Sequence, residues 1–354
     1  MRQLLLITIL CLSSFMLWGQ SPRNLIYVIG DGMGTGHVYS SIVAQGGESN
    51  FLRFPFSGFS RTYSLDHYTT DSGAGGSALM TGHKVQNSHI SMGPKGEWYS
   101  SILTLAQEQG RSAGFVVTVS VLDATPATTY GHVPNRKHKD TLALQMSQCP
   151  FEVMIGCDLS RFLQENRRDG LSPIDTLRAR GYDVVTTLRE MKRSKSPLLC
   201  ALLTPTDEPG NAEVRGPILK EGVKKALDIL SRNDSGFVLM VEGSQIDWAC
   251  HNQDAAHLEM EMKEFDEVLG DILDWAQADG ETLVVVTADH ETGGVTLRKG
   301  DIQKQQCEIT FGTDYHTGVM VPIFSYGPGA EYFSGIHENS DLVDILMKLL
   351  KIHK

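Results

Sequence analysis

The chain has 354 residues, of which 41% are hydrophobic and 21% are charged, and its formal net charge is −11. This composition is ordinary for a globular protein, and the length is ample for a sizeable core without a disulfide scaffold. The acidic balance argues against nucleic acid as a partner, because a phosphate backbone binds basic surfaces. A small anionic substrate is compatible with it, since bound metals and local charge can outweigh net charge.

Residues 1–19 have the pattern of a secretory signal peptide. Arg2 supplies the positive start, an apolar run follows, and Gly19 is a small residue near the expected cleavage point. A membrane anchor is the alternative, but the run is short and is interrupted by Ser13 and Ser14. We therefore expect a secreted or periplasmic protein whose mature chain, 20–354, has no membrane span.

Buried strands and amphipathic helices alternate along the chain. In chain order the predicted strands are 24–29, 114–120, 237–241, 282–287 and 319–326, and the predicted helices are 101–110, about 219–230, about 258–272 and 340–350. Strands that are apolar throughout favour a mainly parallel sheet covered on both faces. We predict an α/β fold, a three-layer αβα sandwich, as a single domain over 20–354 with elaborated loops in roughly 139–235.

Six cysteines are present, and Cys11 lies in the expected signal. The other five do not follow a zinc-finger spacing. Cys149 and Cys157 are close enough in sequence to pair in an oxidising compartment, and buried unpaired thiols are an equally good interpretation.

One serine stands among small residues in TTDSGAGGSALMTG, residues 69–82. Glycine and alanine let the backbone and a ligand approach closely. Ser72 is therefore either part of a tight structural corner or a nucleophile.

Side chains suited to metal binding follow the predicted strands, where ligands bind in sheets of this kind. Asp31 lies in GDGMGTG, whose glycine spacing does not fit a dinucleotide fingerprint. Asp247 and His251 in EGSQIDWACH are four residues apart and share one helix face. The remaining candidates are Glu242, Asp289, His290, His316, Asp123, Thr125 and Arg136. Each one alone fits a surface or core role, but together they favour metal-assisted chemistry on an anion.

The chain resembles the alkaline phosphatase family from about Asn24 to Gly329. The motifs GDGMG, TDSGAG, DATPATTYGHVPNR, VEGSQIDWACH, TADHETGG and HTG occur in the family's order, and only their combination is specific. The resemblance implies a secreted hydrolase, a phosphomonoesterase that uses two zinc ions and one magnesium ion per chain. Small phosphate monoesters are the implied substrates, and a homodimer is the implied assembly.

The resemblance also assigns a role to each matching residue. Ser72 corresponds to the nucleophile that becomes phosphorylated, and Arg136 to the clamp on the phosphate. One zinc would be held by Asp247, His251 and His316, and the second by Asp31, Asp289 and His290. Magnesium would be held by Asp31, Asp123, Thr125 and Glu242.

Three positions depart from the family pattern. Thr69 and Ser77 are mild changes in the serine motif. Trp248 stands where other members often have lysine or histidine, and an indole cannot carry positive charge toward phosphate.

Two other functions compete with this one. A phosphodiesterase of the same superfamily would dispense with the magnesium set and the arginine. A secreted zinc-binding protein without catalysis would keep Asp247, His251 and His316 but would not need Ser72 or Arg136.

Overall fold

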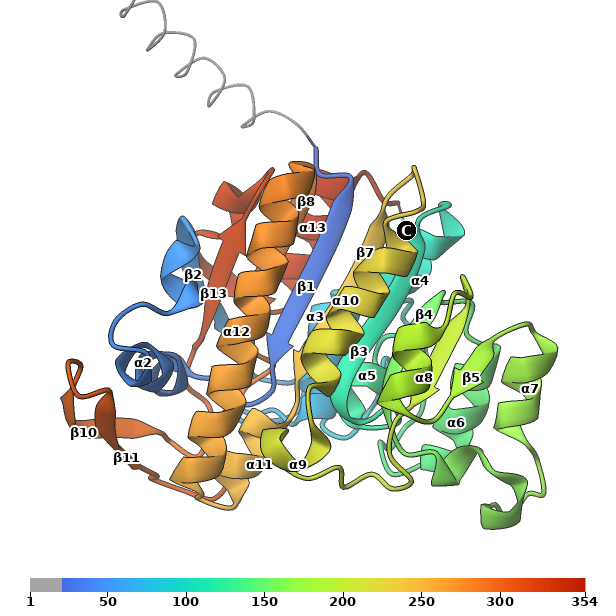
Figure 1. The fold of residues 1–354 in the computed structure, drawn as a ribbon, viewed down its shortest axis with the longest axis horizontal. Helices are drawn as coiled ribbons and strands as arrows, with labels where there is room; N and C mark the ends of the chain where they lie inside the picture. Colours follow the sequence, from blue (N-terminus) through green and yellow to red (C-terminus); the bar gives the residue numbers. More distant parts are fainter. Residues whose placement is uncertain (1–20, 354) are drawn as a thin grey trace, which may run out of the picture.

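The computed structural model describes residues 21–353, so the predicted signal peptide at 1–19 lies outside the described residues. The core of the fold is a ten-stranded sheet in the order β14-β2-β13-β8-β1-β7-β3-β4-β6-β5 (Figure 1). Its strands are β1 (Asn24–Gly30), β2 (Phe56–Arg61), β3 (Ser112–Ser120), β4 (Val153–Cys157), β5 (Asp183–Val185), β6 (Leu199–Leu202), β7 (Phe237–Gly243), β8 (Thr282–Thr287), β13 (Val321–Tyr326) and β14 (Gly335–Glu338). The predicted mainly parallel sheet is confirmed.

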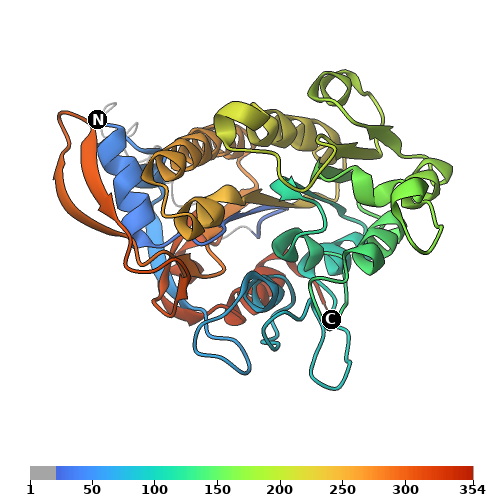
Figure 2. The same ribbon diagram turned by 90° about the horizontal axis from the view of Figure 1, so that it is seen from below.

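Helices cover both faces of the sheet, as Figure 2 shows from below. They are α2 (Thr35–Ala44), α3 (Ser72–Thr81), α4 (Ile102–Glu108), α5 (Ala124–Ala127), α6 (Lys139–Gln148), α7 (Pro173–Ala179), α8 (Leu188–Arg193), α9 (Ala212–Arg215), α10 (Ile218–Leu230), α11 (Gln245–His251), α12 (Ala255–Asp279) and α13 (Asp341–Leu350). Alternate residues of β1 enter two separate cores. Tyr27 joins the core beneath α3, α4 and α13, while Val28 joins the core beneath α10 and α12.

Among the sheet's strands, β13 alone runs against its neighbours, because it pairs antiparallel with both β8 and β2. Its first residue therefore lies at the edge of the sheet where the parallel strands end. Two small antiparallel pairs complete the strands: β10 (Thr296–Asp301) with β11 (Gln306–Thr310), and β9 (Glu291–Thr292) with β12 (His316–Thr317).

The region 139–235, where we expect elaborated loops, instead contains β4, β5 and β6 at one edge of the sheet. Helices α6 to α10 connect or cover these strands. The strands are only three to five residues long. Such short apolar runs give a weak sequence signal.

All five cysteines within the described residues are unpaired, so a Cys149–Cys157 disulfide is not formed in this structure. Both residues are buried, Cys149 within the apolar core, and burial raises the pKa of the Cys149 thiol to about 12 and that of Cys157 to about 11. Within residues 21–353, none of the helices is both long enough and apolar enough to cross a bilayer.

Candidate active site

Ser72 is the first residue of α3, a helix whose ten residues are all buried. Asp71 caps this helix, because its carboxylate accepts a hydrogen bond of 3.0 Å from the Ala74 amide. The free amides and the partial positive charge of a helix N-terminus surround the serine, and both favour a bound anion.

The small residues of α3 have a packing role that the sequence did not indicate. A Cβ atom on Gly75 would lie 2.8 Å from the backbone oxygen of Asp289, and one on Gly73 would lie 3.0 Å from that of His89. The helix therefore rests directly on the segment that carries two candidate ligands. Larger side chains would push Ser72 away from them.

Asp31 follows β1 in a loop whose glycines allow a backbone turn and a close packing that larger residues would prevent. Gly32 adopts a φ of +72°, which disfavours other residues, and its amide donates a 3.2 Å hydrogen bond to Asp289 Oδ1. A Cβ atom on Gly34 would lie 2.4 Å from Cγ of Glu291. These close approaches bring Asp31 and Asp289 together at the carboxyl ends of β1 and β8.

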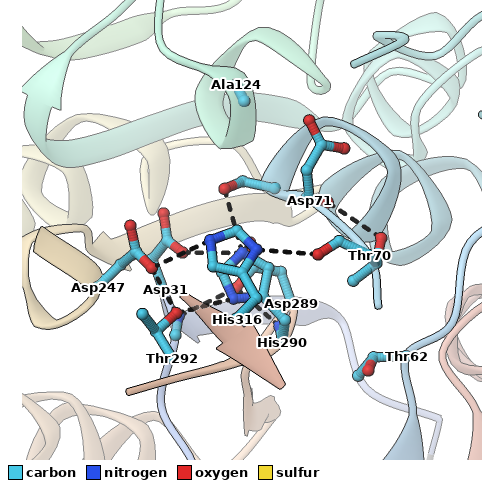
Figure 3. Close-up of polar contacts among 12 residues, drawn as sticks. Asp31, Thr62, Thr70, Asp71, Ala124, Asp247, Asp289, His290, Thr292 and His316 are labelled. Atoms are coloured by element: carbon cyan, nitrogen blue, oxygen red, sulfur yellow. Dashed lines mark hydrogen bonds and ion pairs between the residues drawn. The ribbon is translucent and has the colours of Figure 1, made fainter. Parts of the chain in front are cut away.

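Two compact groups of potential metal ligands lie at this edge of the sheet, and Figure 3 labels all of their members except His251. Within each group the ligand atoms are all within 4.8 Å of one another. The first group is Asp31, Asp289 and His290, and the second is Asp247, His251 and His316. These are the two sets that the sequence motifs indicate, and the groups adjoin because the His290 and His316 rings stack with centroids 3.6 Å apart.

His316 reaches this edge although it precedes a strand. It pairs with Thr292 in the short β9–β12 ladder, which places it beside the segment that follows β8. Because β13 is antiparallel, the residues before it lie where the other strands end.

The histidine hydrogen bonds show that a cation fits the second group. The Nδ1 atoms of His251 and His316 lie 2.7 Å and 2.9 Å from the carbonyl oxygens of Asp314 and Thr70. A carbonyl can only accept, so each Nδ1 carries a proton, and the neutral form of each ring then presents a lone pair at Nε2. The two Nε2 atoms nevertheless lie 3.1 Å apart. Two facing lone pairs repel, and a shared metal ion would remove that repulsion.

In the first group, His290 also directs its Nε2 atom toward the other ligands. The Thr292 hydroxyl donates to Asp247, so it accepts from Nδ1 of His290 at 3.2 Å. Nε2 of His290 then presents a lone pair 3.2 Å from Oδ2 of Asp289 and 3.2 Å from Oγ of Ser72. Burial lowers the pKa of His290 well below its usual value, which keeps the ring neutral as a metal ligand.

Several buried oxygens at the site lack a hydrogen-bond partner. They are Oδ1 of Asp31, Oδ2 of Asp289, Oε2 of Glu242 and Oγ1 of Thr125. Burial, and secondarily neighbouring carboxylates, raise the pKa of Asp31, and burial raises that of Glu242 to about 8. Unpaired carboxylates are costly to bury without a cation, so the donor set fits metal ions with nitrogen and oxygen ligands.

The predicted magnesium set is less compact than the other two. Neither compact group of ligands found among residues 21–353 includes Asp123 or Glu242. The two carboxylates still act on each other, since the charge of Asp123 contributes to the raised pKa of Glu242. All the oxygens in this set are hard ligands of the kind magnesium prefers.

Arg136 lies between two acidic side chains. Its Nη2 is 3.0 Å from Oδ1 of Asp123, and its Nη1 is 3.5 Å from Oδ2 of Asp71. Burial opposes the charge of Asp123, but the guanidinium and Lys139 hold the pKa of that carboxyl below its usual value. These contacts fix the guanidinium near Ser72.

A cavity of about 450 Å³ is bordered by Ser72, Arg136 and the second ligand group. Its lining residues are Asp71, Ser72, Arg136, Asp247, Trp248, His251, Asn252, Tyr315 and His316. Nothing in the sequence motifs indicated a role for Asp71, Thr292, Asn252 or Tyr315. The cap position directly before Ser72 is the sequence signal that could have indicated Asp71.

Comparisons with known proteins identify the family of this chain. The family model for alkaline phosphatase matches residues 22–305. The chain belongs to the alkaline phosphatase family. Its relatives in this family include alkaline phosphatase 4 of Bacillus subtilis, which is 30% identical over 94% of this chain and 89% of the relative, and alkaline phosphatase H of Pseudomonas aeruginosa, which is 29% identical over 94% and 86%.

Solved structures of alkaline phosphatases have the same fold. The enzyme from the Antarctic bacterium TAB5 aligns with a TM-score of 0.88 and 32% identity, over 95% of this chain and 100% of that one. A histidine-to-aspartate variant of the TAB5 enzyme, with magnesium bound in its M3 site, aligns with the same score and identity over 95% and 99%. The chain is therefore a phosphatase of a metal-dependent family.

Proposed function

We propose that this protein hydrolyses phosphate monoesters through a phosphoserine intermediate on Ser72. The observation that carries the proposal is the position of the Ser72 hydroxyl, 3.2 Å from Nε2 of His290 within one compact ligand group. The second group lies beside it, so the serine stands at a site that could hold two metal ions.

In this mechanism the Ser72 oxygen attacks phosphorus while the bond from phosphorus to the leaving oxygen breaks. An alcohol departs, and water then cleaves the phosphoserine to release inorganic phosphate. Arg136 binds the non-bridging oxygens, and the helix N-terminus at Ser72 supports their charge. Asp71 and Asp123 hold the guanidinium in place.

Zinc is the metal that the two compact groups suit, because imidazole nitrogens and carboxylate oxygens are its usual ligands. When bound, the ions would lower the pKa of the serine hydroxyl and stabilise the negative charge on the leaving oxygen. For the third set, Asp31, Asp123, Thr125 and Glu242, we propose magnesium. The TAB5 variant in which an aspartate replaces a histidine, with magnesium bound in its M3 site, supports a magnesium site in this fold.

We further propose that residues 20–354 form one domain, exported to the periplasm or medium and assembled as a homodimer. A phosphodiesterase is less well supported, because the arginine and the third ligand set are both present. A non-catalytic zinc protein would leave Ser72 and Arg136 without a role.

The proposal is tested by measuring phosphate release from ethyl phosphate and 4-nitrophenyl phosphate by the purified protein, before and after chelation. We expect chelator-sensitive release that returns when zinc and magnesium are added together. Ser72→Ala should lower kcat by several orders of magnitude while the zinc content stays near that of the unaltered protein. Undiminished turnover by that variant would remove Ser72 as the nucleophile.

A further inference from the structure

We propose that Trp248 and Tyr315 form an aromatic wall that selects phosphate monoesters whose leaving group carries an uncharged aromatic ring. The inference rests on the proposed function, because it concerns the leaving group of that reaction. Both residues line the same cavity as Ser72 and Arg136, but neither belongs to a ligand group.

The leaving group must extend toward these two residues. In phosphoryl transfer the attacking and leaving oxygens lie roughly in line, so the leaving group projects away from Ser72. Ser72 contacts His290 of the first ligand group, while Trp248 and Tyr315 border the second group. The indole is next in sequence to Asp247, and the phenol contacts His251 and His316.

Tyr315 is held rigidly although 57% of it is exposed. Its ring stacks on His316 with a centroid distance of 4.8 Å and an interplanar angle of 15°, and it meets the edge of His251 at 5.9 Å. Its backbone amide bonds to Thr313 Oγ1 and its carbonyl accepts from Gly293. A ring fixed in this way loses little conformational entropy when a ligand packs on it.

Trp248 reaches the cavity from a different element than Tyr315. It lies on α11, three and four residues before His251 and Asn252, so these three side chains share one helix face. All three line the cavity. The half-buried indole offers a flat apolar surface, and aromatic pairs interact more favourably than their buried area alone predicts.

The charge of the cavity also favours a neutral leaving group. Arg136 is the only lysine or arginine among the lining residues, and it is already paired with Asp71 and Asp123. No such cation is left for a second phosphate or a carboxylate on the substrate. A ring without charge is therefore the leaving group that this wall accommodates best.

The test compares benzyl phosphate with cyclohexylmethyl phosphate. Both esters release a primary alcohol of similar size and reactivity, so they differ mainly in aromaticity. We expect kcat/KM to be about 3- to 10-fold higher for benzyl phosphate, the range that an aromatic contact supplies. In Trp248→Leu and Tyr315→Leu the ratio of kcat/KM for the two esters should fall toward one, and kcat/KM for ethyl phosphate, measured in the same variants, reports any loss that is common to all esters.

The matched control is Trp98→Leu, which removes an aromatic ring that is 67% exposed and outside the cavity. It should leave the benzyl preference unchanged. A second measurement uses benzylphosphonate and cyclohexylmethylphosphonate as competitive inhibitors, because inhibition constants report the aromatic contact without the chemical step.

Equal kcat/KM for the two esters, or a preference that survives in both leucine variants, would overturn the aromatic wall while leaving the phosphomonoesterase intact. Failure to hydrolyse ethyl, benzyl and cyclohexylmethyl phosphates alike would overturn the proposed function and the inference with it. The two failures are therefore distinguishable in one set of assays.

Discussion

Three histidines at the site share one arrangement, in which Nδ1 bonds to an oxygen of the protein and Nε2 faces the ligand group. The partners of Nδ1 are the carbonyls of Asp314 and Thr70 and the hydroxyl of Thr292. Hydrogen bonds of this kind fix the tautomer and orientation of a metal-binding imidazole. The site is therefore prepared for metal by atoms that are not themselves ligands.

Arg136 yields a prediction about phosphate binding. Arg136→Ala removes a charge-assisted contact to the anion, so the inhibition constant for inorganic phosphate should rise about 10- to 100-fold. Arg53→Ala breaks an exposed ion pair with Asp274 and should leave that constant unchanged. Equal phosphate inhibition in the unaltered protein and Arg136→Ala would count against the clamp.

His37 is predicted to stabilise the fold around α11. Its Nδ1 accepts from the Gly34 amide at 3.0 Å, so its Nε2 donates to Cys250 Sγ, 3.1 Å away. Burial lowers the pKa of His37 to about 4, and the ring is therefore neutral. His37→Phe leaves a buried amide unpaired and should lower the free energy of unfolding by about 1–3 kcal/mol.

Urea denaturation would measure this effect, with His353→Phe at an exposed position as the control. We expect the control to change the free energy of unfolding by less than about 0.5 kcal/mol. If the two variants unfolded at the same urea concentration, the His37 contacts would have no stabilising role.

At the scale of elements, α9 and α12 are joined by a buried ionic cluster. The Arg215 guanidinium lies 2.7 Å and 2.6 Å from the two carboxylate oxygens of Glu261, and it also contacts Glu264. His257 adds a contact of 3.2 Å to Glu261. The short helix α9 is thus fastened to the long helix α12.

We predict that Arg215→Met destabilises the protein by about 3–5 kcal/mol, because it leaves buried carboxylates without a partner. The control Arg232→Met breaks an exposed pair with Asp228 on the surface and should cost less than about 1 kcal/mol. Chemical denaturation of both variants would measure the difference. Similar losses of unfolding free energy in the two variants would show that burial of the Arg215 cluster does not add to its contribution to stability.

For the whole molecule, the two ligand groups connect the ends of β1 and β8 with α11 and β12. Asp31, Glu242 and Asp289 all have raised pKa values, with burial as the main cause. Without cations these carboxylates oppose the packing of the segments that carry them. Bound metal should therefore stabilise the folded chain in addition to its proposed role in the reaction.

Metal removal is predicted to lower the free energy of unfolding by at least about 3 kcal/mol, as expected for a ligand present at a hundred times its dissociation constant. Thermal unfolding before and after chelation would measure this loss, and zinc with magnesium should reverse it. Superimposable unfolding curves for the chelated and the metal-loaded protein would contradict a stabilising role for the site.

Much of the fold and of the candidate site could be predicted because the signals are local. The continuous apolar runs of β1, β3, β7 and β8 indicate buried parallel strands, and such strands end at one edge. Strand β2 was missed because FSGFSR is half exposed and contains glycine. Strand β5 was missed because it has only three residues.

By itself, the sequence determined the class of fold and the residue types that could bind metal and phosphate, since hydrophobic periodicity and motif composition are properties of the chain. Only the tertiary structure decided that β13 runs antiparallel and thereby brings His316 to His251. It alone placed Tyr315 and Trp248 on the lining of one cavity. These contacts join segments far apart in the sequence, and packing between elements, not local propensity, sets their distances.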